Sequence, residues 1–250
     1  MKLAVGWDVG AWHCTRSSGS QDALVAIRVA DTPERVGQAF RGNLRGRLTA
    51  NPEKVLANLF DAMGLGGLEV DEVIFAIDAT LGWPRAFLEL VGEGKMPGEV
   101  PMGKRVDNEL LTRRTERVVA KKMAGTPLSS VQDRIGSQST KALALLTLLQ
   151  LQRSEPGVWT GEVDGTKVVA IETYPALCKR SAQVSSLSAL LGPWPKEGSD
   201  EADALLCAIV AWLFATERQS LVAPQVTDTV EGWIWHPIDL ARVDGKRDEA

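Results

Sequence analysis

The sequence predicts an α/β fold. Short apolar runs typical of buried strands alternate along the chain with longer segments whose apolar residues recur at helical spacing. Of the 250 residues, 44% are hydrophobic and 24% are charged, and the formal net charge is −4. This composition excludes disordered, collagen-like and coiled-coil chains. No linker rich in Pro, Gly or Ser divides the sequence, so we expect a single domain over residues 1–250.

Two strands open the chain, over residues 3–9 and 23–30, with a Ser/Gly turn between them. A helix is expected to begin at Asn51 and to end at Gly64, because the apolar residues between them recur at helical spacing. The next apolar run, 70–78, is a strand that ends in an acid, as the first strand does.

The middle of the chain is expected to be helical. The Gly/Pro-rich stretch 92–103 predicts a loop, and a polar helix over 106–123 and a very apolar helix over 138–152 follow it. Together these segments form a helical insertion around 92–152 in the single domain. A further strand is expected over 167–172, and it also ends in an acid.

The last elements are a helix over 200–218, with acids in its first turn and an apolar body, and a short strand over 231–237. Trp233 and Trp235 alternate on one face of that strand. The tail 244–250 is expected to fray.

The cysteines and the N-terminus predict a cytoplasmic protein. Cys14, Cys178 and Cys207 lie far apart without a Cys-x-x-Cys pair, which favours buried free thiols in a reducing compartment. An acid at position 8 interrupts the apolar stretch that a signal peptide would need. No apolar run approaches the roughly 20 residues of a membrane span, so we expect no membrane partner.

Acidic residues at element ends are the strongest chemical pattern. Asp8, Asp78 and Glu172 each end a predicted strand, and adjacent strand ends in such a sheet lie about 5 Å apart. Asp200 and Asp203 share one face of the late helix. Carboxylates held together require a compensating cation, and Mg²⁺ or Mn²⁺ prefers oxygen ligands. We therefore expect a site for two such ions about 4 Å apart.

Each acid also has a structural interpretation. Asp8 and Asp78 are placed where turn or helix caps occur, and Asp200 precedes an apolar helix as an N-cap would. Asp203 lies in the first helical turn, where interaction with the helix dipole favours an acid. With only two histidines in the chain, a His-rich zinc site is excluded.

A basic segment could bind the substrate. Arg113, Arg117 and Lys121 follow i, i+4, i+8 spacing on the predicted polar helix and, with Arg114, are candidate phosphate contacts. Trp83 follows the acid of its strand closely and is a candidate for stacking on a base. The alternatives are a solvated helix face and ordinary packing of the tryptophan.

Several short motifs occur in the order and spacing of a known family. They are GWDVG (6–10), AIDATLGWP (76–84), RRTERVV (113–119), PLSSVQDRIG (127–136), AIETYP (170–175), DEADALLCAI (200–209) and EGWIWHP (231–237). Over roughly residues 3 to 238 the chain resembles the predicted nucleases with an RNase H-like fold catalogued as domain of unknown function (DUF) 429. The resemblance implies a mixed sheet whose first three strands run antiparallel, with helices on both faces.

The resemblance also implies roles for individual residues. It puts Asp8 on the first strand beside Asp78 on the fourth, Glu172 on the following strand and Asp203 on the late helix. These four acids would be catalytic and would bind the ions, with Asp200 as a further ligand. We therefore expect a Mg²⁺- or Mn²⁺-dependent nuclease acting on DNA or RNA. The sequence does not indicate its oligomeric state.

Two other functions stay open. GWDVG also resembles the first phosphate motif of the actin and sugar-kinase superfamily, whose members are ATP-dependent phosphotransferases. That function needs a second Asp-x-Gly motif, whereas Asp78 is followed by Ala79 and Thr80. The other alternative is a non-catalytic nucleic-acid-binding module on the same fold.

Overall fold

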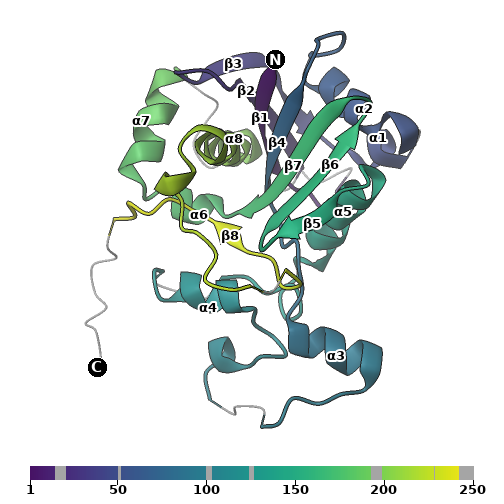
Figure 1. Cartoon of the computed structure of the whole chain (residues 1–250), viewed down its shortest axis with the longest axis vertical. Coiled ribbons are helices and arrows are strands. Elements are labelled where there is room, and N and C mark those ends of the chain that lie inside the picture. The colour runs from purple at the N-terminus through teal and green to yellow at the C-terminus, as the bar shows by residue number, and fades with distance from the viewer. Residues whose placement is uncertain are drawn as a thin grey trace.

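A mixed β-sheet forms the centre of the molecule (Figure 1). The computed structural model describes residues 1–14, 21–49, 52–99, 103–123, 127–192, 199–227 and 229–241. The strands are β1 (Lys2–Asp8), β2 (Asp22–Arg28), β3 (Glu34–Gly42), β4 (Glu72–Asp78), β5 (Gln152–Glu155), β6 (Val158–Val163), β7 (Thr166–Thr173) and β8 (Ile234–Trp235). Their order is β3-β2-β1-β4-β7-β6-β5, and β8 pairs with the end of β7.

The strand directions agree with the expected mixed sheet. β1, β2 and β3 run antiparallel, and β1 is joined in parallel to β4, which is joined in parallel to β7. The middle of β1 and of β4 is fully buried, because helices cover both faces of the sheet there. Strands buried on both faces have continuous apolar sequences rather than alternating ones. This is why the runs at 3–9 and 70–78 were visible in the sequence.

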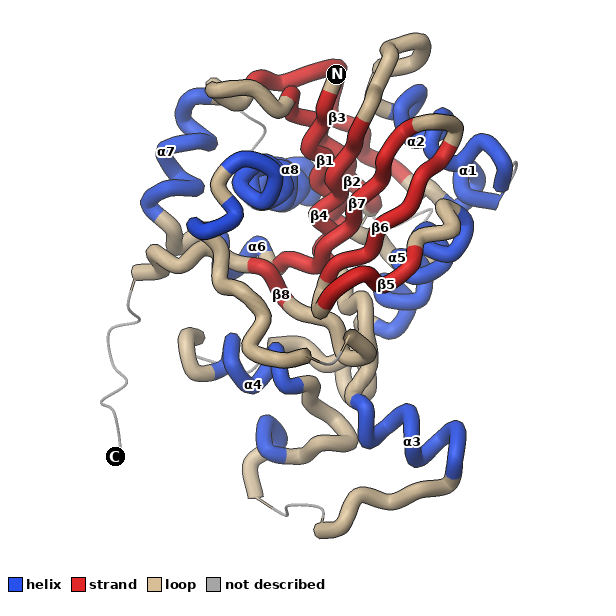
Figure 2. The backbone as a smooth tube through the Cα atoms, in the orientation of Figure 1, coloured by secondary structure: helices blue, strands red, loops and turns tan. Residues whose placement is uncertain are grey.

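Helices cover the two faces of the sheet (Figures 1 and 2). On one face lie α1 (Arg45–Thr49), α2 (Val55–Ala62) and α5 (Gly136–Leu148), and on the other α6 (Pro175–Cys178), α7 (Ala182–Leu190) and α8 (Asp200–Thr216). Short 3₁₀ turns span Pro52–Lys54, Arg105–Asp107 and Arg218–Ser220. Each face has its own apolar core, and Trp233 and Trp235 are both buried in the core on the α8 side, as the alternation predicted.

Helix α8 packs directly on the backbone of β1 at Gly6. A Cβ atom at this position would lie 1.9 Å from the carbonyl oxygen of Ala204 and 2.3 Å from the backbone nitrogen of Ala208. Only glycine therefore permits this contact. The contact sets the first turn of α8, which carries Asp203, against the strand that ends in Asp8.

The segment between β4 and α5 projects beyond the strand ends (Figure 1). It contains α3 (Arg85–Glu93) and α4 (Arg114–Ala120). The predicted helix over 106–123 is wrong: the backbone is extended at Asn108 and at Arg113, so a 3₁₀ turn and the short α4 replace it. The apolar helix α5 does not project with them but packs on the sheet through residues such as Leu145.

Three further expectations can be compared with the structure. Cys14, Cys178 and Cys207 are buried free thiols, as predicted. In the part of the chain that the structure describes, no helix is both long and apolar enough to span a bilayer. The tail predicted to fray, 244–250, lies outside the described residues.

Candidate functional site

Asp8 and Asp78 are paired at the ends of neighbouring strands. They face each other in the parallel register of β1 and β4, and Glu172 of β7 is opposite Ile77, one position earlier. All three acids line one pocket of about 210 Å³ at this edge of the sheet. The pocket is closed on other sides by residues from the projecting segment and from α5, including Leu128 and Gln138. The sequence-based expectation that these three acids meet at one edge is confirmed.

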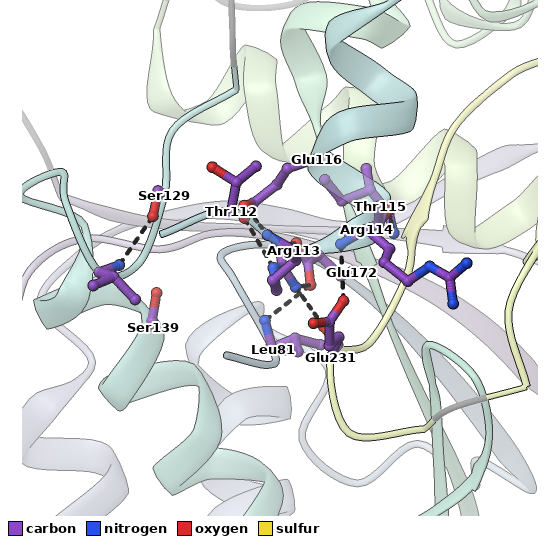
Figure 3. A network of polar contacts seen from close by, with 12 residues as sticks. Leu81, Thr112, Arg113, Arg114, Thr115, Glu116, Ser129, Ser139, Glu172 and Glu231 are labelled. Atoms are coloured by element: carbon purple, nitrogen blue, oxygen red, sulfur yellow. Dashed lines mark hydrogen bonds and ion pairs between the residues drawn. The ribbon is translucent and has the colours of Figure 1, made fainter. Parts of the chain in front are cut away.

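Glu172 is held by a buried arginine (Figure 3). Arg113 donates from Nη1 and Nη2 to the two carboxylate oxygens of Glu172, at 2.8 and 2.6 Å, and from Nε to Glu116, at 2.8 Å. The backbone N–H of Leu81 donates to Glu172 as well, at 2.9 Å. Burial alone disfavours the charged guanidinium, but the charges of Glu172 and Glu116 outweigh it and raise the pKa of Arg113.

The position of Arg113 corrects one expectation. Its side chain is only 1% exposed, so it cannot contact a phosphate from a surface stripe. The stripe fails because α4 begins only at Arg114, and Arg113 turns inward at the N-cap toward Glu116 and Glu172. Arg113 is therefore a buried partner of Glu172 that lines the pocket, and the expectation that it belongs to an exposed basic stripe is wrong.

The other candidate contacts differ in exposure. Arg114 and Lys121 are exposed. Arg117 is half-buried, with Nη1 3.4 Å from Glu109 Oε1. Trp83 is half-buried and stacks on Phe87, with ring centroids 5.9 Å apart and planes inclined by 26°. Of the predicted phosphate contacts, the two exposed ones are the best placed to meet a ligand.

The acids of α8 are also paired with cations. Asp203 Oδ1 lies 2.7 Å from Nζ of Lys179, the residue at the C-terminal end of α6. Asp200 Oδ2 lies 2.8 Å from Nη2 of Arg41 on β3. Neither acid lines the pocket.

The N-cap of α8 is Ser199, whose Oγ accepts a hydrogen bond from the backbone N–H of Ala202 at 3.2 Å. The interpretation of Asp200 as the N-cap is therefore wrong. Asp200 has a different structural role, because it also accepts a hydrogen bond from the backbone N–H of Gln21 at 3.1 Å.

Two functional neighbours were missed in the sequence. Asp22 and Lys141 form an ion pair in which both side chains are 0% exposed. Asp22 also accepts hydrogen bonds from Trp7 Nε1 and the backbone N–H of Gly10, both at 3.0 Å, and so fixes the chain on either side of Asp8. The available signal was Lys141 itself, a charge immediately before the apolar run of α5.

Glu231 is the other residue that was missed. Its carboxylate accepts hydrogen bonds from the backbone N–H of Arg85, at 2.9 Å, and from that of Arg114, at 2.8 Å. Glu231 thus caps α3 and α4 together. Its backbone carbonyl accepts a hydrogen bond from Arg113 at 2.9 Å. The EGWIWHP motif therefore anchors the projecting segment next to the pocket (Figure 3).

Asp8 and Asp78 differ from the other acids around the pocket. The others each have a cationic partner: Arg113 for Glu172, Lys179 for Asp203, Arg41 for Asp200 and Lys141 for Asp22. No residue described in the structure gives the carboxylate of Asp8 or of Asp78 a hydrogen bond or an ion pair. The site thus contains two adjacent carboxylates whose charge is not compensated by a direct contact.

Both aspartates have raised pKa values. Burial, and then the charges of Asp78, Asp200, Asp203 and Asp22, raise the pKa of Asp8 to about 9. Burial, with the charges of Asp203 and Glu172 against that of Lys179, raises the pKa of Asp78 to about 7. Both carboxyls therefore hold protons more strongly than free aspartate, and a bound cation would reverse this.

The expected five-carboxylate group is not formed. Within the described ranges, no three His, Cys, Asp or Glu side chains are grouped closely enough to hold a metal ion. Glu172, Asp200 and Asp203 are directed to their own cations, which leaves the pair Asp8 and Asp78.

No family model, no curated protein and no solved structure matches this chain. The family resemblance therefore depends on the sequence motifs alone and stays a prediction.

Proposed function

We propose that this chain is a divalent-cation-dependent phosphodiesterase acting on nucleic acid, in which Asp8 and Asp78 hold the ion. The observation that carries the proposal is the in-register pair of carboxylates that line one pocket and have no partner. An RNase H-like fold is part of the proposal. It is supported by the three antiparallel strands, the parallel β1, β4 and β7, and the helices on both faces.

The two acids fit a magnesium ion. Mg²⁺ usually keeps several waters and is bound by one or two carboxylates together with substrate phosphates. A pair of oxygen ligands at the edge of a pocket meets that requirement. The neighbouring acids contribute, after burial, to the raised pKa values of both groups, and a bound cation would offset the repulsion between these acids. Manganese, which accepts the same ligands, is an equivalent probe.

Each residue around the pocket has a distinct role in this proposal. Asp8 and Asp78, once deprotonated, would hold the ion, which would supply activation of water and stabilisation of the departing oxygen. Arg113 orients Glu172, and Glu172 in turn fixes the backbone of Leu81 in the loop that follows Asp78. Asp22 and Lys141 fix the loop that follows Asp8. These contacts hold the two ligands in place.

The first test is cleavage of labelled single- and double-stranded oligonucleotides at pH 8 with Mg²⁺ or Mn²⁺. We expect cleavage by the unmodified protein and a loss of at least about 100-fold in Asp78→Asn, because the neutral amide cannot replace an anionic ligand. Asp71→Asn is the matched control, since Asp71 is exposed and immediately precedes the opposite end of the same strand. Binding without cleavage under all these conditions would contradict the proposal and favour a non-catalytic module.

A second prediction concerns the exposed basic residues. If Arg114 and Lys121 contact phosphates, replacing both with alanine lowers the slope of log affinity against log salt by about 0.7 to 0.9 for each lost contact. The affinity should fall equally for all sequences, because phosphate contacts carry no base information. Lys54→Ala is the control, since this exposed lysine precedes α2 on a distant part of the molecule. Equal slopes for the double variant and the control would show that Arg114 and Lys121 are solvated and do not contact phosphates.

A further inference from the structure

The contact between Lys179 and Asp203 affects how many divalent ions can bind beside Asp8 and Asp78. Asp203 lies in the first turn of α8, next to Ala204, whose backbone packs against Gly6 of the strand that ends in Asp8. It is the acid of this helix that the sequence motifs predict as a catalytic ligand of the ions, so a second divalent ion would be expected to bind it. Its Oδ1 atom instead lies 2.7 Å from the ammonium nitrogen of Lys179.

We propose that the ammonium group of Lys179 takes the place of a second divalent ion, so that the site binds one ion and Lys179 contacts the substrate phosphate. This inference rests on the proposed function. Asp203 is then a positioning residue, which acts by holding Lys179 beside the paired aspartates.

The charges of the site support a single ion. The guanidinium of Arg113 neutralises Glu172, with its Nη2 atom 2.6 Å from the carboxylate, and Lys179 neutralises Asp203. Only Asp8 and Asp78 remain for a divalent cation among the acids described around the pocket. A second ion would have to displace one of the protein's own cations, and the described residues hold no preformed group of three ligands.

Lys179 is also able to meet a phosphate. Its side chain is 42% exposed, whereas Arg113 is 1% exposed and fully engaged. An ammonium group has three N–H donors, and Asp203 is the partner that the structure gives it. The short helix α6 follows directly from β7, whose end lines the pocket through Thr173. Lys179 is therefore held at the end of a short helix that begins beside the pocket.

The test counts Mn²⁺ ions by isothermal titration at pH 8 in the intact protein and three variants. We expect one ion in the unmodified chain and in Lys179→Arg, which keeps the positive charge. We expect two ions in Lys179→Met, because Asp203 is released as a ligand, and one ion again in Lys179→Met/Asp203→Asn. Lys167→Met is the matched control at the opposite, N-terminal end of β7 and should bind one ion.

Oligonucleotide binding in the presence of EDTA provides the second measurement. Lys179→Met should lower the slope of log affinity against log salt by about 0.7 to 0.9, while Lys167→Met leaves it unchanged. Two ions in the unmodified protein, one ion in Lys179→Met, or an unchanged slope in Lys179→Met would overturn the inference. No bound ion in the unmodified protein is a different result, because it would overturn the proposed function itself.

Discussion

Replacing Arg113 by methionine should lower the free energy of unfolding by about 3–5 kcal/mol, as expected when one partner of a buried ion pair is removed. The substitution leaves Glu172 and Glu116 buried without their shared guanidinium, and it removes the hydrogen bond to the carbonyl of Glu231. Urea denaturation followed by tryptophan fluorescence measures the change.

Arg114→Met is the matched control for this experiment. Arg114 is the next residue in the chain, but its side chain is exposed, so we expect a change within about 0.5 kcal/mol. The double variant Arg113→Met/Glu172→Gln should be more stable than Arg113→Met alone, because it removes one of the two uncompensated charges. Equal stability of Arg113→Met and Arg114→Met would contradict the assignment of Arg113 as the buried centre of this network.

Without a divalent ion, the protein should become less stable as the pH rises from about 4 to about 9. The folded chain holds protons on Asp8 up to a pKa of about 9 and on Asp78 up to about 7, whereas the unfolded chain releases them near 3.8. The folded state therefore binds more protons in this range, and raising the pH favours unfolding. Mg²⁺ or Mn²⁺ should reduce the loss, because it binds the ionised carboxylates of the folded state.

The variant Asp8→Asn shows how much of this pH dependence of stability comes from Asp8. At pH 8 without metal, the variant should be more stable than the unmodified protein by at least about 1.4 kcal/mol, the equivalent of one pKa unit. It should also show a smaller dependence on pH and less stabilisation by Mn²⁺. Asp71→Asn is the control, because the pKa of this exposed group is lowered by the N-terminal amine and the group titrates below this range. If the unmodified protein were equally stable at pH 5 and pH 8, this would contradict the raised pKa values of Asp8 and Asp78.

The central strands could be predicted because they are buried on both faces. The apolar runs of β1, β4 and β7 have no polar alternation. An acid that lines the pocket ends β1 and β4, and in β7 it is the residue before the last. Strands β3, β5 and β6 were missed because most of their residues are exposed or half-buried, so their sequences contain no apolar run. Pairing with a neighbouring strand, which the local sequence does not show, determines these strands.

The sequence predicted where the acids of the candidate site lie, but not which of them are paired with a cation. The strand-end pattern placed Asp8 and Asp78 correctly, since register follows from the parallel strands. The pattern could not show that Arg113 turns inward, because its partner Glu172 is far away in sequence and only the fold brings the two together. The same is true of Lys141 and Asp22. Local spacing predicts which helical face a side chain occupies, but not which buried charge lies opposite.

Anomalous diffraction from crystals grown with Mn²⁺ tests the central claim most directly, because it locates the ion without reference to activity. We predict one anomalous peak between the carboxylates of Asp8 and Asp78, and no peak there in crystals of Asp8→Asn. A well-ordered pocket with no peak between these two residues, in crystals grown at a Mn²⁺ concentration that supports cleavage, would contradict the account.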